Sequence, residues 1–294
     1  MVGQRRLSKA VVILGFLFPS LAGLLLFQLI PMLSSAVISF TDWDLLTKAR
    51  FVGLDNYREA LQDEQTLTSM LNILKYIAGY LPSVLALGLL FAVLLNRKLR
   101  GVQFYRIAIF VPVITSWVAV SIIWRWLLNG QSGLVNYVLS LVGIQGPVWL
   151  QDFFWAMPAI IAVSVWKDLG YVTIILLAGL QDISDDYYEA ATIDGAGGFQ
   201  KFWRVTLPLL TPSLFFVLVI SLINGFQLFD QVLVMTNGGP AGSTSTLVQQ
   251  IYENAFQSYK MGFASAQSWI LFVIILIVTI IQQQLQKRWV TYDR

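Results

Sequence analysis

Six long apolar segments, separated by shorter polar stretches, constrain the fold of this chain more than any other feature. They cover residues 10–30, 69–95, 104–128, 153–180, 207–235 and 263–285. A helix that crosses a bilayer needs about 20 predominantly apolar residues, and each segment is long enough. Because the segments are continuous and do not alternate apolar with polar residues, they indicate helices and not barrel strands. We therefore predict an all-α polytopic membrane protein with one transmembrane domain over residues 1–294.

Composition excludes several classes of function. Hydrophobic residues make up 57% of the chain and charged residues 12%, whereas a soluble domain has about 25% charged residues. The chain has no Cys and no His, so it lacks disulfides, thiol chemistry and the commonest metal ligand and general base. It also lacks the glycine-rich phosphate-binding motif of P-loop ATPases. We expect a chain that is no enzyme and holds no metal or cofactor. We assign its net charge of +3 to basic loops and expect no nucleic-acid partner.

The first apolar segment follows basic residues, as the apolar region of a signal peptide does. Its apolar run is longer than such a region usually is, and no clear cleavage site follows it. We therefore expect an uncleaved first span.

Lys and Arg near the span ends predict the orientation, because such residues concentrate in cytoplasmic loops. With the N-terminus inside, the inner set is Arg5, Arg6, Lys9, Arg97, Lys98, Arg100, Arg106, Lys201, Arg204, Lys287, Arg288 and Arg294. The outer set is Lys48, Arg50, Arg58 and Lys260. This bias predicts that both termini and the polar loop at residues 181–206 lie in the cytoplasm.

The 181–206 loop contains signals for a short helix. Asp186 and Glu189 are three residues apart, which resembles a capping box with Asp in the usual Ser/Thr role. This predicts a helix from Tyr187 to Asp194, with Gly195 at the position after its end. A second helix is expected to lead from Phe199 into the fifth span.

A helix of about eight residues is marginal when alone in water, so another surface must hold it. Ala190 and Ala191 are small enough for a partner to approach the backbone closely. Tyr187, Tyr188 and Ile193 are side chains that could serve as anchors in an interface. Two interpretations stay open at this point. The helix docks onto a cytoplasmic partner, or it is a connector that packs only on its own spans.

A longer pattern surrounds this helix. It consists of Glu189-Ala190-Ala191, then Gly195, then nine residues, and then Val205-Thr206-Leu207-Pro208. This pattern resembles the signature loop of ABC-importer permeases, which usually has Ile where Val205 stands. Further stretches are similar to the carbohydrate branch of that family, and to its maltose-type first permease subunit in particular. They are Phe40–Trp43, Val52–Tyr57 and Thr236–Pro240.

The resemblance covers essentially the whole chain and implies a type I ABC-importer permease fold in a bacterial or archaeal inner membrane. It implies that the loop couples the spans to an ATPase, through Glu189, Ala190, Ala191, Asp194, Gly195, Leu207 and Pro208. It also implies a second, homologous permease as heterodimer partner, two ATP-binding subunits that hold ATP and Mg, and an external substrate-binding protein. The outer loop at residues 237–240 is where that protein is expected to dock. Lys201 and Arg204 either contact ATPase acids or lipid phosphates, or simply follow the positive-inside rule.

Two groups of polar residues within the spans are candidates for a substrate path. Lys167 and Asp168 lie near the middle of the fourth span, where charges are costly and avoid lipid. They either line a polar path or lock the helix bundle. Asn224, Gln227 and Asp230 are three residues apart in the fifth span, so we expect them on one helix face.

Phe226 and Phe229 flank that stripe, and amides, a carboxylate and aromatic rings together suit a sugar. The other interpretation of the stripe is hydrogen bonding between helices. An ion-coupled secondary transporter or channel remains the alternative function, because Asp168 and Asp230 could bind ions within the spans.

Overall fold

A computed structural model describes residues 2–97 and 101–290, with side chains from residue 13 onward. The side chains of Arg5, Arg6, Lys9, Lys98, Arg100 and Arg294 lie outside the described residues, so the orientation count remains a prediction. The chain divides into two compact units. One contains the residues up to Asp63 together with Ile251–Ile270, and the other contains Glu64–Gln250 together with the residues from Leu271 onward.

In the first unit, the helix of the first apolar segment extends beyond its predicted end at residue 30. It consists of α1 (Val2–Leu24), a π-helical turn (Leu25–Leu29) and α2 (Ile30–Ile38). A small antiparallel hairpin, β1 (Thr41–Asp42) and β2 (Arg50–Phe51), and α3 (Asp55–Gln62) follow it. The hairpin is the one sheet among the described residues, and the fold is otherwise helical as predicted.

Asn56 organises the segment around the hairpin in the first unit. Its side-chain amide donates hydrogen bonds to the carbonyl oxygens of Ser39, at 2.8 Å, and Thr41, at 2.9 Å. A side chain at Gly262 would overlap the carbonyl of Thr41, so the start of α15 approaches the hairpin through a glycine. The aromatic and polar stretches around residues 40–57 therefore fold this segment through specific hydrogen bonds.

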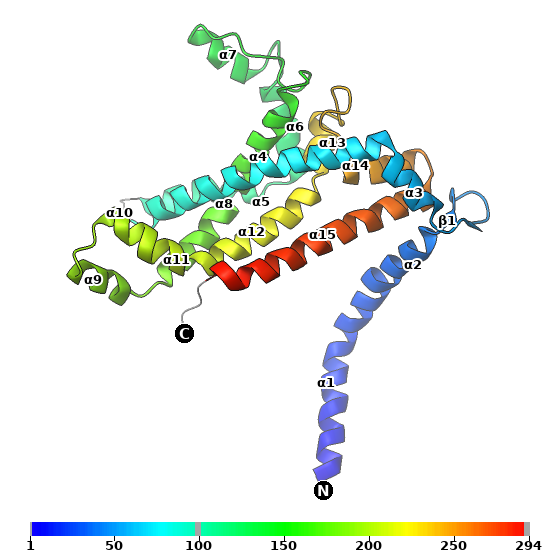
Figure 1. Cartoon of the computed structure of the whole chain (residues 1–294), viewed down its shortest axis with the longest axis horizontal. Coiled ribbons are helices and arrows are strands. Elements are labelled where there is room, and N and C mark those ends of the chain that lie inside the picture. The colour runs from blue at the N-terminus through cyan, green and yellow to red at the C-terminus, as the bar shows by residue number, and fades with distance from the viewer. Residues whose placement is uncertain (1, 98–100, 291–294) are drawn as a thin grey trace. The chain divides into compact units, whose positions relative to one another are not determined.

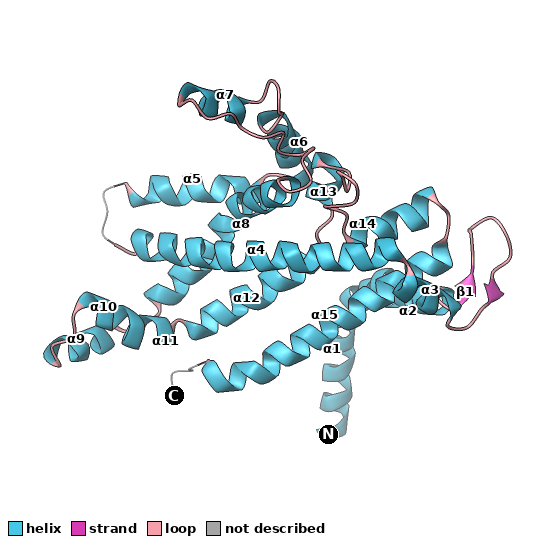
Figure 2. Ribbon diagram, turned by 45° about the horizontal axis from the view of Figure 1, so that its top comes forward, coloured by secondary structure: helices cyan, strands magenta, loops and turns pink. Residues whose placement is uncertain are grey.

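The second unit contains most of the helices (Figures 1 and 2). They are α4 (Glu64–Leu95), α5 (Val102–Ile114), α6 (Trp117–Leu127), α7 (Leu134–Leu141), α8 (Ala156–Gln181), α9 (Asp185–Ile193), α10 (Gly198–Lys201), α11 (Leu207–Leu209), α12 (Thr211–Phe226) and α13 (Asp230–Met235). Two more helices begin in one unit and end in the other: α14 (Leu247–Tyr252) and α15 (Met261–Trp289). Two further π-helical stretches are Phe202–Thr206 and Glu253–Gln257.

The core of the second unit forms where α4 and α8 pack along each other. Val84, Val172 and Leu176 are completely buried there. A side chain at Gly88 of α4 would overlap Val172, and one at Gly170 of α8 would overlap the backbone of α5. Small residues let membrane helices approach closely, since the gain comes from packing and not from leaving water.

Four helical segments are long and apolar enough to cross a membrane, and six spans result if two bent helix pairs each count as one. The predicted third span is α5 and α6, which meet at 100°, and the predicted fifth span is bent by 62° before α12. The first break follows Pro112, where Thr115 turns to extended dihedral angles. Pro208 and Pro212 flank the second. Proline removes a helical hydrogen bond and commonly causes such kinks.

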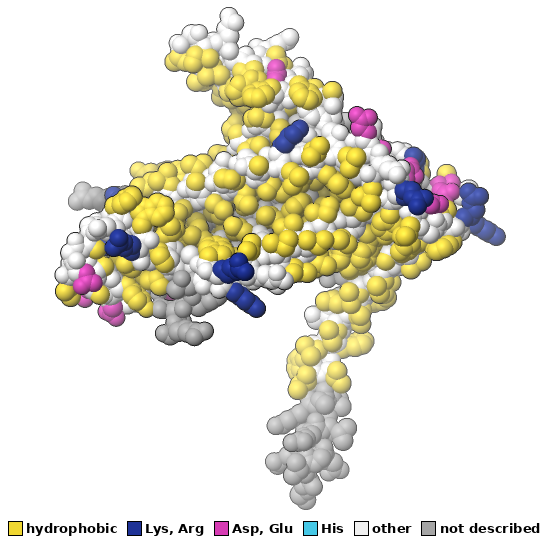
Figure 3. All heavy atoms as spheres, viewed as in Figure 1, with side chains coloured by type: hydrophobic (Ala, Val, Ile, Leu, Met, Phe, Trp, Pro, Cys, Tyr) yellow, Lys and Arg dark blue, Asp and Glu magenta, His cyan; other side chains and the backbone are white. Residues whose placement is uncertain are grey.

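Apolar side chains cover much of the outer face over α4 and α12 (Figure 3). Leu74 and Leu90 of α4 and Phe216 of α12 are each at least half exposed. A soluble protein rarely leaves such a continuous apolar surface. This surface is the part of the unit that suits lipid.

Candidate functional site

The polar loop folds as the caps predict, but its first helix begins earlier than expected. Helix α9 starts at Asp185, because Ser184 is the N-cap and its Oγ accepts a hydrogen bond from the Asp186 amide at 3.3 Å. The predicted start at Tyr187, with Asp186 as the capping residue, is therefore wrong. Asp185 and Asp186 instead occupy the first turn, where the helix dipole favours negative charge.

The C-terminal end of α9 agrees with the prediction for Gly195. Gly195 has a φ of +76°, which glycine adopts without the clash that a side chain would cause. The amide of Gly195 bonds to the Thr192 carbonyl at 3.0 Å, and the Ala196 amide bonds to the Ala191 carbonyl at 2.9 Å. These two bonds form a Schellman motif, in which Asp194 is the C-cap.

Helix α9 contacts the following helical segment through one edge only. Tyr188 Oη lies 3.1 Å from Thr206 Oγ1, and Lys201 Nζ donates to Thr192 Oγ1 at 2.7 Å. Lys201 thus holds α9 in place within the loop, a role that the sequence did not suggest. No residue of α9 is fully buried; Glu189 and Ala190 are exposed, whereas Ala191 is partly covered.

Leu207 and Pro208 form the joint between this loop and the fifth span. Both lie in α11 and are half-buried. The carbonyl of Pro208 accepts a hydrogen bond from Thr211 Oγ1 at 2.6 Å, at the start of α12. A displacement of α9 would therefore reach α12 through a short, bonded segment.

A polar cavity of about 220 Å³ lies inside the second unit, and all three residues of the predicted stripe line it. Its lining is Tyr76, Tyr80, Trp117, Asp168, Asn224, Gly225, Gln227, Leu228, Phe229, Asp230 and Gln231. Asn224, Gln227 and Asp230 do not share one helix face, because α12 ends at Phe226 and α13 begins at Asp230. The break between these helices is what turns them toward one cavity.

Aromatic residues outside the predicted set complete this cavity. The rings of Tyr76 and Tyr80 stack with centroids 5.1 Å apart, and Tyr80 Oη donates to Asp168 Oδ2 at 2.7 Å. Phe229 lines the cavity, whereas Phe226 is buried and does not. The two tyrosines are four residues apart in the second span, but nothing in the sequence shows which span they meet.

Lys167 and Asp168 have different roles, although they are adjacent. Asp168 lines the cavity, whereas Lys167 does not. Lys167 Nζ donates to the Val113 carbonyl at 3.2 Å and lies 4.6 Å from the Trp117 ring centroid. The carbonyl belongs to the last turn of α5, where a lysine can satisfy a group that the helix leaves unpaired. Lys167 therefore stabilises the bend between α5 and α6.

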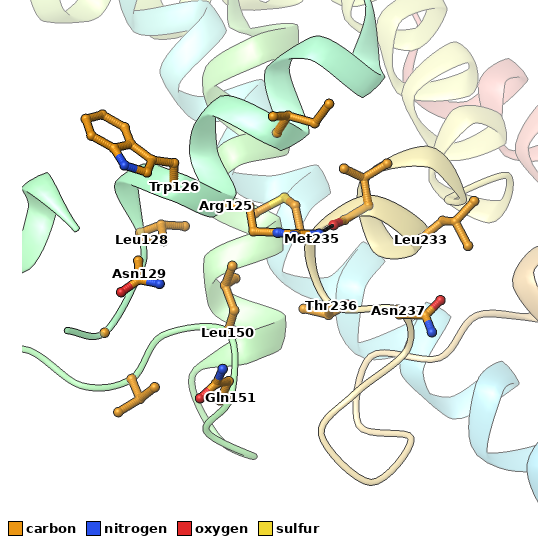
Figure 4. A pocket seen from close by; sticks show the side chains of 14 residues that line it. Arg125, Trp126, Leu128, Asn129, Leu150, Gln151, Leu233, Met235, Thr236 and Asn237 are labelled. Atoms are coloured by element: carbon orange, nitrogen blue, oxygen red, sulfur yellow. Dashed lines mark hydrogen bonds between the residues drawn. The ribbon is translucent and has the colours of Figure 1, made fainter. Parts of the chain in front are cut away.

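A larger pocket of about 980 Å³ lies at the other end of α6. Figure 4 shows Asn129 and Gln151 on one side of it and Thr236 and Asn237 on the other. Arg125, which lines this pocket, donates a hydrogen bond from Nη1 to the Val234 carbonyl at 3.2 Å. Arg125 thus links α6 to α13.

The sequence matches the family model described as binding-protein-dependent transport system inner membrane component over residues 84–291. It is 37% identical to a probable ABC transporter permease protein of Bacillus subtilis (YesP), over 95% of this chain and 91% of that protein. It is 35% identical to the multiple sugar-binding transport system permease protein of Streptococcus mutans (MsmF), over 93% of this chain and 94% of the relative.

Two further similarities extend to an archaeon and to a solved structure. The trehalose/maltose transport system permease protein of Thermococcus litoralis (MalF) is 35% identical, over 91% of this chain and 92% of that protein. A chain of a bacterial ABC transporter involved in the import of the acidic polysaccharide alginate shares the fold, with a TM-score of 0.87 at 23% identity. That match covers 98% of this chain and 99% of the other.

Proposed function

The chain belongs to the family of binding-protein-dependent transport system inner membrane components, the permeases of ABC importers, and from this membership we propose that it imports a carbohydrate. It is a multi-pass inner membrane protein, and ATP hydrolysis resides in partner subunits. Membership in this family excludes the alternative function that the sequence had left open, an ion-coupled secondary transporter or channel. The relatives from Streptococcus mutans and Thermococcus litoralis are named for sugar transport, which supports the substrate class.

The cavity between α4, α6, α8 and the α12–α13 break is the proposed sugar path. Gln227 and Asn224 offer amide donors and acceptors, while Asp168 and Asp230 offer acceptors for hydroxyl groups. Aromatic rings beside them suit the C–H face of a sugar ring. The lining contains no Lys or Arg, so the part of the substrate in contact with it is proposed to be uncharged.

Helix α9 is the proposed coupling helix to an ATPase subunit. The side chains of Ile193 in α9 and of Phe199 nearby are 87% and 78% exposed. Large apolar side chains are rarely left this exposed in a segment that contacts only water. Aromatic and large apolar anchors are typical of interface centres. Movement of the ATPase would pass from Glu189 and Gly195 through Leu207 and Pro208 to α12, and would open and close the path alternately.

The proposed assembly contains a second, homologous permease, two ATP-binding subunits and an external substrate-binding protein. We place both termini and α9 on the cytoplasmic side, as the distribution of Lys and Arg predicts. The loop at residues 236–246 would then face the binding protein. Its Thr244 Oγ1 donates to the Gly239 carbonyl at 2.7 Å and lies 2.8 Å from Thr236 Oγ1, which gives this loop a fixed shape.

ATP-driven uptake by the assembled transporter in proteoliposomes tests the path. Gln227→Ala is expected to raise the KM for the transported sugar, while ATP hydrolysis stimulated by the binding protein continues. Gln131→Ala serves as the matched control, because Gln131 is an exposed amide that does not line the cavity. Equal KM values for the two variants would contradict the proposed path.

A further inference from the structure

Helix α7, in the segment that joins α6 to α8, carries an apolar stripe that is largely exposed. The stripe consists of Leu134, Tyr137, Val138 and Leu141, which are 48%, 61%, 53% and 68% exposed. Their spacing places them on one face of the helix. This face is apolar over the whole length of α7, which runs from Leu134 to Leu141. Such a face needs an apolar environment.

The opposite face of α7 is held by Val135, which packs against the buried cluster around Val120 and Leu128, and by the hydrogen bonds of Asn136. Asn136 Nδ2 donates to the carbonyls of Gly130, at 2.9 Å, and Pro147, at 3.1 Å. Asn136 Oδ1 accepts a hydrogen bond from Trp149 Nε1 at 2.7 Å. A rotation that buried the stripe would break these bonds. The asparagine therefore keeps the stripe pointing away from the unit.

Charge and position favour lipid as the environment of the stripe. No ionisable Asp, Glu, Lys or Arg occurs between Arg125 and Asp152, although loops in water commonly carry such residues. The segment connects the ends of α6 and α8, which belong to two spans, so it begins and ends at the membrane surface. Helices with one apolar face lie in the plane of such an interface.

The aromatic residues around α7 are those that membrane interfaces favour. Trp149 contacts Trp155 edge-to-face with ring centroids 5.4 Å apart, and Phe154 contacts Trp155 at the same separation. Both contacts lie directly before α8.

We propose that α7 lies in the membrane interface, with its apolar stripe among the lipid acyl chains. The interaction depends on apolar burial and not on anionic headgroups, because the segment is uncharged. It also has a structural consequence. Gly130, Val148 and Gln151 from the same segment form one wall of the 980 Å³ pocket beside α6, so the bilayer would hold this wall in place. This inference goes beyond the transport function and does not require the substrate to be a sugar.

Spin labels on single introduced cysteines test this proposal, since the chain has no native Cys. Tyr137→Cys and Leu141→Cys place labels on the stripe. Ser140→Cys is the matched control on another face of the same helix, and Lys48→Cys is a reference in an exposed polar loop. Collision rates with molecular oxygen, which dissolves in lipid, and with a water-soluble nickel chelate are measured for the assembled transporter in lipid nanodiscs.

The expected result is an oxygen-to-nickel collision ratio that is severalfold higher at the two stripe positions than at Ser140→Cys and Lys48→Cys. Frequent collisions with nickel at the stripe would show that it faces water and would overturn the proposal. Rare collisions with both reagents would show that a protein covers the stripe, and would overturn it equally. Leu134→Cys provides a third stripe position if one of the labels disturbs assembly.

Discussion

Replacing Gly195 by valine tests whether the shape of the α9 end matters for transport. Gly195 has a φ of +76°, and left-handed dihedral angles cost an L-residue with a side chain about 1–2 kcal/mol. The cost is higher for valine than for most residues, because its branched Cβ crowds the backbone. Asparagine adopts these angles routinely, so Gly195→Asn is a matched control that also adds a side chain. No atom lies within 4 Å of a Cβ added at Gly195, so we attribute the expected difference between the two variants to dihedral strain.

The α9 helix has little with which to offset that strain. None of its residues is buried, and its last turn relies on the two Schellman bonds. A cost of about 1–2 kcal/mol reduces the population of the intact helix end by a factor of about 5–30. We expect ATP-driven uptake in proteoliposomes to fall by about that factor in Gly195→Val and to stay close to the unmodified rate in Gly195→Asn. Equal uptake by the two variants would refute the reasoning.

Three further perturbations test separate parts of the account. Gly170→Ala should lower the free energy of unfolding by about 1–3 kcal/mol in denaturant titrations, because a Cβ at this position overlaps the backbone of α5. Gly23→Ala is the control and should not lower it, because a Cβ at Gly23 meets open space. Tyr80→Phe removes the hydroxyl donor that lies 2.7 Å from Asp168 Oδ2. It should lower the free energy of unfolding by about 0.5–1.5 kcal/mol in the same titration. An unchanged unfolding midpoint would contradict that contact. Hydrogen bonds from its own turn hold the pKa of Asp44 below its usual 3.8, so ionised Asp44 stabilises the turn above the unfolded pKa. As the pH falls through the lower folded pKa, this stabilisation disappears, and the protection of amides in the turn, measured against the intrinsic exchange rate at each pH, should fall. Protection that does not change as Asp44 is protonated would contradict this prediction.

Local rules predicted the features that depend on a few neighbouring residues. The apolar runs located the spans, and Gly195 marked the end of α9 because one backbone conformation there favours glycine. The N-cap was misplaced by two residues, from Ser184 to Asp186, since both side chains can cap a helix. Pro112 and Pro208 could have indicated the two bends. The spans were located from the mean hydropathy of long segments, which single prolines hardly change.

The cavity illustrates what the sequence could not provide. Asn224 and Gln227 were identified from a shared helix face, yet they meet through a helix break. Tyr80 lines the same cavity because α4 packs on both α8 and α12, and these pairings depend on contacts between distant residues. For Lys167 and Asp168, the sequence left open whether they line a polar path or lock the helix bundle. The rotation of α8 relative to α4 and α5 decides which of the two side chains faces the cavity.

The central claim is that this permease moves its substrate only when α9 transmits ATP hydrolysis in a partner subunit. Its most direct test is the uptake of labelled sugar by the complete transporter in proteoliposomes, with ATP and binding protein, for the unmodified chain and for Glu189→Lys. Glu189 is exposed on α9, so a change in its charge alters the proposed docking surface without disturbing a core. We expect uptake that requires ATP and is lost in Glu189→Lys. Full uptake and normally stimulated ATP hydrolysis in Glu189→Lys, or uptake without ATP, would contradict it.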